Sequence, residues 1–137
     1  MSPGAGARPA PPAGSLGPVV RWAPVLLWAA LIFVLSSMST LPAPPWGFTD
    51  KHAHFVTYGV LAALMIWAFT DRAPARTTWA VAAAAVALAA LYGASDEFHQ
   101  SFVPGREVSA LDLAADTAGA LVAAVALRAW AIISARR

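Results

Sequence analysis

The feature that most constrains this chain is a set of four long apolar stretches, separated by short polar or proline-containing segments. They cover residues 19–38, the stretch between Lys51 and Asp71, the stretch between Arg76 and Asp96, and residues 109–133. About 20 apolar residues in a helix cross the ~30 Å hydrocarbon core of a bilayer. The alternating strands of a membrane barrel are absent from the pattern. The sequence therefore predicts an all-α, polytopic membrane protein with four transmembrane helices in a bundle, the third running on to about Gln100.

The composition argues against the common soluble classes. Hydrophobic residues make up 59% of the 137 residues and charged residues 12%, against roughly 45–50% and 25% in soluble domains. A chain of this size buries only ~60–70% of its unfolded surface in a globule, so much of its apolar surface must face lipid. Its nine basic residues form no cluster, which speaks against a nucleic-acid partner. Without cysteine it has no disulfide and no thiolate metal site.

The first 18 residues are almost all Pro, Gly, Ala and Ser, and Arg8 is their only charged residue. Such a segment cannot form a packed core. We therefore predict a disordered cytoplasmic leader over 1–18 and a transmembrane domain over 19–135. A cleaved signal peptide is the alternative for the first apolar stretch, but that stretch exceeds the usual core of about 7–15 residues.

The distribution of charge predicts how the helices are oriented. With both termini in the cytoplasm, seven arginines and Asp71 fall on the cytoplasmic side, which gives a net charge of +6. Lys51, Arg106 and six acids fall on the other side, which gives −4, and all three histidines lie there too. Positive residues mark cytoplasmic loops. We therefore expect the polar chemistry at the outer ends of the second, third and fourth helices.

Polar residues at those outer ends recur at a spacing of four, which places them on shared helix faces. A charge at membrane depth costs about 2.5–3.5 kcal/mol, so such side chains must face inward and meet partners. The turn at Pro104-Gly105 should carry the basic residue after it back over the helix ends. The sequence predicts one outward-opening pocket made of Asp50, Lys51, His54, Tyr58, Asp96, Glu97, Gln100, Arg106, Asp112 and Asp116.

These segments resemble the motifs of the VanZ-like family. Residues 50–58 (DKHAHFVTY) are similar to its second-helix signature, and residues 92–106 (YGASDEFHQSFVPGR) to its central motif. Ser109, Asp112 and Gly119 resemble its last-helix motif, and the resemblance covers residue 19 to the C-terminus. It departs at Asp116, where the family usually has Asn.

The resemblance implies a bacterial plasma membrane and a cell-envelope context, because the namesake is associated with low-level teicoplanin resistance. It implies no reaction. We therefore keep glycopeptide tolerance as an expectation about context only.

Three functions remain open for the predicted pocket. Lys51 and Arg106 could engage an anionic, lipid-linked envelope ligand, while the acids position them or hold a cation. Alternatively, the polar network only holds the helices together, with Asp50 and Asp112 acting as helix caps. The third function is an enzyme acting on a lipid-linked phosphate, with Asp96, Glu97 and His54 as its candidate acid–base residues. The sequence alone leaves the enzyme question undecided, and anion binding is our leading hypothesis.

We expect membrane lipids as partners, and neither a cofactor nor a resident metal. His52 and His54 are two residues apart, so on a helix they point to nearly opposite sides and are poorly placed to share a zinc ion. A channel or transporter is disfavoured because four short helices without an inverted repeat offer little pore.

Overall fold

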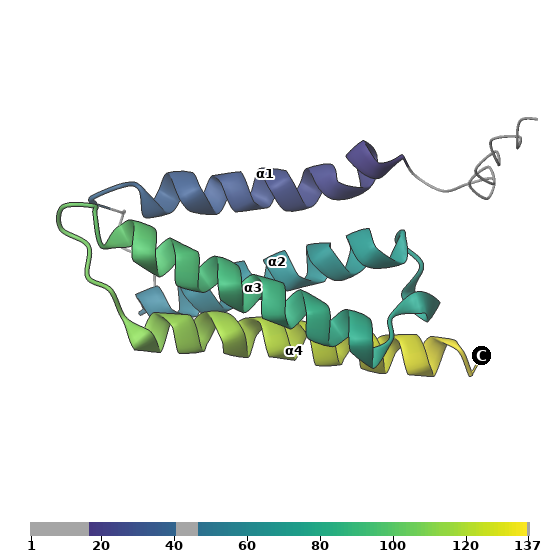
Figure 1. Cartoon of the computed structure of the whole chain (residues 1–137). Helices are drawn as coiled ribbons and strands as arrows, with labels where there is room; N and C mark the ends of the chain where they lie inside the picture. Colours follow the sequence, from purple (N-terminus) through teal and green to yellow (C-terminus); the bar gives the residue numbers. More distant parts are fainter. Residues whose placement is uncertain (1–16, 41–46, 137) are drawn as a thin grey trace, which may run out of the picture.

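The computed structural model describes residues 17–40 and 47–136, and there four long helices form a bundle (Figure 1). The helices are α1 (Pro18–Ser36), α2 (Asp50–Thr70), α3 (Trp79–Gln100) and α4 (Ala110–Ser134), with a short 3-10 helix, η1 (Pro74–Arg76), after α2. Each of the four is long and apolar enough to cross a membrane. The predicted all-α, multi-pass membrane fold is thus confirmed. Of the predicted leader, residues 1–16 lie outside the described ranges, and Pro18 already belongs to α1.

Three of the helix starts are set by hydroxyl side chains. Thr49 precedes α2; its backbone N–H donates to Nδ1 of His52 at 3.2 Å, and its hydroxyl lies 2.7 Å from the same nitrogen. Thr78 accepts from the backbone N–H of Val81 at the start of α3, and Ser109 accepts from that of Asp112 at the start of α4. Capping of this kind satisfies N–H groups that lack an intrahelical partner. The predicted start of the fourth helix at Ser109 is confirmed.

Small residues bring the backbones of α2 and α4 into contact. A Cβ atom on Gly119 would collide with the backbone oxygen of Phe55, and one on Gly59 would lie 3.2 Å from the oxygen of Gly119. Gly119, a motif position in the sequence, therefore lets α2 and α4 approach closely. Ala85 and Ala89 of α3 are fully buried and allow the same kind of close packing.

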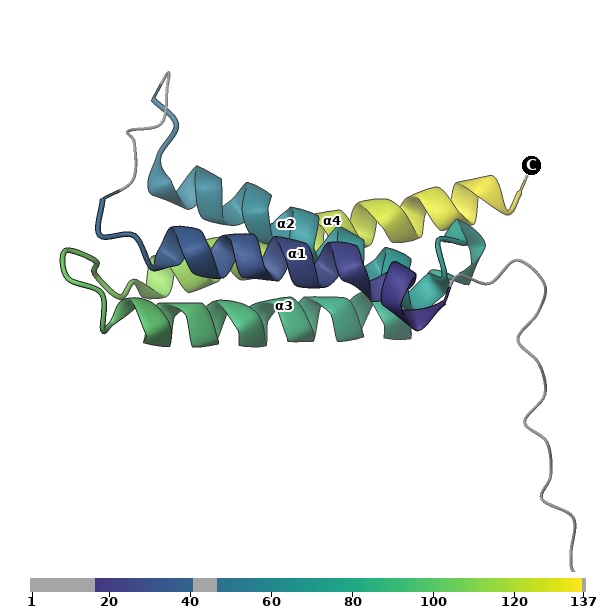
Figure 2. The same ribbon diagram turned by 90° about the horizontal axis from the view of Figure 1, so that it is seen from above.

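Helix α1 lies along one side of the bundle (Figure 1), runs over the other helices when seen from above (Figure 2), and packs against α2 and α3. The indole N–H of Trp28 donates to the carbonyl of Thr57 at 3.0 Å, and the hydroxyl of Tyr92 donates to the carbonyl of Ala29 at 2.7 Å. Two polar bonds to backbone carbonyls therefore hold α1 against the other helices. The rest of its surface is largely exposed and apolar, as expected of a helix that faces lipid.

Charge divides between the two ends of the bundle. The last turns of α1 and α3 and the first turns of α2 and α4 lie at one end, and η1 and the last turn of α4 lie at the other (Figure 1). We call the first the acidic end; its charged residues are Asp50, Lys51, Asp96, Glu97, Arg106, Glu107, Asp112 and Asp116. The opposite end carries Asp71 and the arginines at 21, 72, 76, 128 and 136.

Candidate functional site

The acidic end contains a cluster of buried polar side chains contributed by three helices. Each of them is at least nine-tenths buried, although four are carboxylic acids. They are Tyr58 of α2, Asp96, Glu97 and Gln100 of α3, and Asp112 and Asp116 of α4. Burying a carboxylate is costly unless it is paired, so the partners of each acid determine what this cluster can do.

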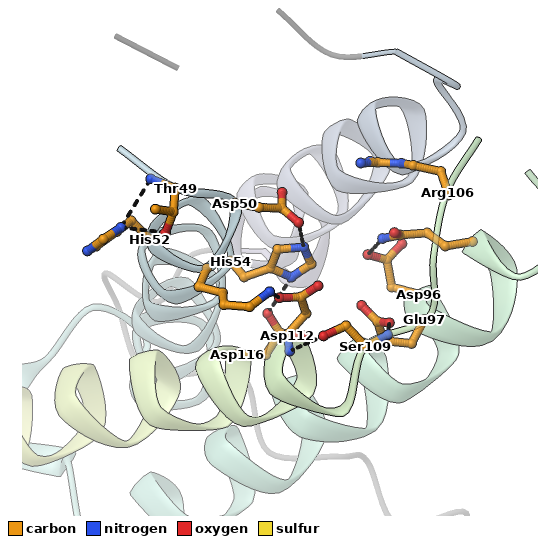
Figure 3. Close-up of polar contacts among 12 residues, drawn as sticks. Thr49, Asp50, His52, His54, Asp96, Glu97, Arg106, Ser109, Asp112 and Asp116 are labelled. Atoms are coloured by element: carbon orange, nitrogen blue, oxygen red, sulfur yellow. Dashed lines mark hydrogen bonds and ion pairs between the residues drawn. The ribbon is translucent and has the colours of Figure 1, made fainter. Parts of the chain in front are cut away.

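His54 links two of the acids. Its Nδ1 lies 2.9 Å from Oδ1 of Asp116, which is 1% exposed, and its Nε2 lies 4.0 Å from Oδ2 of Asp50 (Figure 3). The ring of Tyr58 lies parallel to the imidazole, with 6.3 Å between ring centroids. Gly93 provides space for Asp116, because a Cβ there would lie 2.7 Å from Oδ2 of Asp116. The bond to Asp116 fixes the imidazole so that Nε2 faces Asp50.

Asp112 is more than the helix cap considered from the sequence. Its carboxylate pairs with the ammonium of Lys51, on the neighbouring helix α2. The backbone N–H of Ser109 instead donates to Oε2 of Glu97 at 2.8 Å. In a capping box that N–H is bound by the acid three residues later. Here an acid of α3 takes that place, which frees Asp112 to hold Lys51.

Arg106 is placed by a turn. The N–H of Arg106 donates to the carbonyl of Val103 at 3.1 Å, and Gly105 between them has φ of +84°. Proline followed by glycine at positive φ is the pattern of a type II turn, so the predicted tight turn is confirmed. The guanidinium reaches the carbonyl of Leu35 at the end of α1, at 3.4 Å. Within residues 17–40 and 47–136 it forms no ion pair with an acid.

Asp96 and Gln100 form the remaining pair, since the Gln100 amide donates to Oδ2 of Asp96 at 3.1 Å. At the acidic end, four buried polar atoms have no hydrogen-bond partner among the described protein atoms. They are the hydroxyl of Tyr58, Oε1 of Glu97, Nε of Arg106 and Oδ2 of Asp116. The cluster therefore keeps some capacity to bind polar groups.

Two hollows open at the acidic end. The first, the inner cavity, measures about 90 Å³ and lies between α1, α2 and α3; Ile32 and Leu35 form part of its apolar wall. Its polar lining is Ser36, Asp50, His54, Thr57, Tyr58, Asp96, Gln100 and Arg106. The second, the polar hollow, measures about 350 Å³ and is lined by Asp50, Lys51, Gln100, Gly105, Arg106, Glu107, Ser109 and Asp112. Asp50, Gln100 and Arg106 line both.

All ten residues singled out from the sequence thus lie at the acidic end, but they separate into layers. Asp116 and Tyr58 lie deep, whereas Lys51 and Asp50 are exposed. Sequence reasoning missed Ser109 and Glu107 as lining residues of the polar hollow, and Ser36 and Thr57 as lining residues of the inner cavity. The available signal was their position in the sequence, since Thr57 and Ser109 belong to the motifs and Glu107 directly follows one of them.

Two histidines lie outside this arrangement. His52 belongs to the cap at Thr49, and His99 hydrogen-bonds Ser37 at 2.9 Å. Potential metal ligands are found instead in Asp50, His54 and Asp112, each of which offers a donor atom within 4.8 Å of the others. Only one histidine therefore contributes to this group.

The comparisons agree with the motifs. The family model described as VanZ/LLP1 matches residues 19–132. This range covers nearly all of the four helices and every residue of the cluster. Neither the comparison with curated proteins nor that with solved structures gives a match. Because the match extends over most of the chain and includes the acidic end, the protein belongs to the VanZ/LLP1 family.

Proposed function

We propose that this protein binds, in the polar hollow, the anionic headgroup of a lipid-linked or other cell-envelope ligand. The proposal places it in a bacterial plasma membrane with both termini in the cytoplasm, so that the acidic end faces outward. A contribution to glycopeptide tolerance would follow from holding such a ligand. The observation that carries the proposal is that Lys51 and Arg106, the two basic residues of the acidic end, line the same hollow.

Both cations keep donors for a ligand. An ammonium group has three N–H donors, and Lys51 forms an ion pair with one acid, Asp112. The guanidinium of Arg106 offers a planar fork that suits phosphate, and its described contact is one carbonyl, that of Leu35. The volume of the polar hollow, about 350 Å³, falls within the ~300–1,000 Å³ of small-molecule sites.

The acids of the hollow oppose an anion, and their partners reduce this repulsion. Lys51 neutralises Asp112, and the other two acids of the hollow, Asp50 and Glu107, are exposed to solvent, where their charges are screened. An anion entering beside Arg106 therefore meets a guanidinium that has no paired acid in the described part of the chain. This arrangement favours a headgroup with phosphate oxygens over a neutral one.

Lipid mass spectrometry on gently purified protein tests the proposal. We expect anionic lipids to be enriched on the wild type and reduced about tenfold or more on Arg106→Gln, because a charge-assisted hydrogen bond contributes ~1.5–3 kcal/mol. Arg76→Gln is the matched control, since Arg76 is exposed at the opposite end of the bundle. That variant should retain the lipids of the wild type.

Two results would decide against binding. Equal lipid content in all three proteins would remove the proposed role of Arg106. If Arg106→Gln instead loses as much thermal stability in detergent as Gly119→Leu, the polar network is structural. Release of phosphate from an added lipid-linked phosphate would favour the enzymatic alternative, for which the histidine oriented by Asp116 is the specific observation.

A further inference from the structure

We infer that Asp50, His54 and Asp112 form a binding site for a divalent transition-metal cation, with Zn²⁺ as the best-matched ion. The site lies where the inner cavity meets the polar hollow, since Asp50 lines both, His54 lines the first and Asp112 the second. This inference is independent of the anion-binding proposal.

The donor atoms are close to the separations that a shared metal requires. One ligand atom from each of the three residues lies within 4.8 Å of the others, and Nε2 of His54 is 4.0 Å from Oδ2 of Asp50. Two ligands that each bind zinc at about 2.0–2.2 Å lie roughly 3.4 Å apart at the tetrahedral angle. Asp50 begins α2 and is exposed, so a small change of its side chain can close the difference.

The imidazole is oriented as a metal ligand would be. Nδ1 of His54 lies 2.9 Å from the buried carboxylate of Asp116. When that nitrogen carries the proton and donates to Asp116, Nε2 presents its lone pair toward Asp50 (Figure 3), and a donor atom of Asp112 lies within 4.8 Å of the group. Histidines that bind metals typically donate their other ring N–H to a carboxylate or carbonyl in this way. Asp116 would therefore position the ligand without touching the metal.

Glu97 supplies an independent indication that a cation belongs here. Its side chain comes from a third helix and the residue is 5% exposed. One carboxylate oxygen accepts from the N–H of Ser109, whereas Oε1 has no partner among the described protein atoms. The carboxylate points toward Asp112 (Figure 3). A buried carboxylate oxygen without a donor is costly, and a cation between Asp50, His54 and Asp112 would offset that cost.

The formal charge of the cluster favours a divalent ion. Asp50, Glu97, Asp112 and Asp116 contribute four negative charges when ionised, and Lys51 contributes one positive charge. Lys51 holds Asp112 through a flexible side chain that is 45% exposed, so its ammonium can move aside or keep one oxygen. A dication would reduce the net formal charge of this group from −3 to −1.

The ligand set selects among the common divalent ions. One imidazole with two carboxylates suits zinc, which accepts three protein ligands and leaves a fourth position open. Mg²⁺ and Ca²⁺ prefer all-oxygen environments with six or more ligands. We therefore expect zinc to bind in the presence of excess magnesium and calcium.

Equilibrium dialysis of the purified full chain against Zn²⁺, after treatment with a chelator, tests the inference. We expect one zinc per chain, undiminished by a hundredfold excess of Mg²⁺ or Ca²⁺. His54→Gln should weaken zinc binding at least tenfold, while His52→Gln should leave it unchanged. His52 is the matched control because it lies two residues away, is exposed and belongs to the Thr49 cap.

Asp50→Asn keeps the test decisive should His54→Gln fail to fold, since Asp50 is exposed and its change leaves the buried pairs intact. Zinc should raise the melting temperature of the wild type in detergent and should raise that of Asp50→Asn much less. The inference is overturned if the wild type takes up no stoichiometric zinc. It is equally overturned if Asp50→Asn binds zinc and is stabilised by it as the wild type is.

Discussion

At the scale of single residues, the acidic end is organised as separate acid–donor pairs. Asp116 is held by His54, Asp112 by Lys51, Asp96 by Gln100, and Glu97 by the N–H of Ser109. Most of these pairs join different helices. Removing a donor would leave a buried carboxylate unpaired, which typically costs several kcal/mol. Substitutions that keep the acceptor should therefore be far milder than truncations.

Asp116→Asn is the sharpest case of this difference. The amide oxygen can still accept from Nδ1 of His54, so we expect the free energy of unfolding to change by less than about 1 kcal/mol. Asp116→Ala removes the acceptor and should cost about 1–3 kcal/mol. Thermal unfolding in detergent measures both. If the two variants are equally destabilised, the bond between His54 and Asp116 is not what stabilises this position.

Spacing alone predicted that these polar residues share helix faces, but it could not predict their partners. Asp112 and Lys51 are 61 positions apart, and their contact depends on how α2 and α4 are rotated about their axes. The link between Glu97 and Ser109 depends likewise on where α3 ends relative to the start of α4. Such details follow from packing between helices, which periodicity within one helix does not specify.

At the scale of the elements, hydropathy and caps were sufficient to locate the helices. Thr49 and Ser109 are the N-cap residues at which α2 and α4 begin. Each apolar stretch ends close to the last residue of its helix. The contact that sets the approach of α2 to α4 was only partly predictable. The sequence singled out Gly119 as a motif position, and the structure identifies Phe55 as the residue whose backbone it meets.

Gly119→Leu should therefore disrupt the packing of α2 on α4. The new side chain would collide with backbone rather than with a movable side-chain end, and overpacking typically costs about 1–3 kcal/mol. Ala118→Leu is the matched control, because Ala118 is adjacent on α4 and exposed. Thermal unfolding in detergent should show a lower melting temperature for the first variant alone. Equal melting temperatures would contradict the close approach described here.

At the scale of the whole molecule, the separation of acids from arginines has a physical consequence. Each helix crosses the bundle from one charged end to the other, so the chain can present the acidic end to only one side of a membrane. The sequence predicted this separation from loop charges. The hollows could not be predicted in the same way, because their volumes depend on how side chains from three helices and the turn at Gly105 fill the acidic end.

The orientation of the molecule can be measured directly, because the chain has no cysteine. Ser101→Cys lies in the connection between α3 and α4, and Ala75→Cys lies in η1; both positions are exposed. Since arginine-rich segments are retained in the cytoplasm, a membrane-impermeant maleimide should label the first variant in intact cells. The second should be labelled only after the membrane is opened. The reverse pattern would place the polar hollow and the zinc ligands on the cytoplasmic side, where an extracytoplasmic envelope ligand could not reach them.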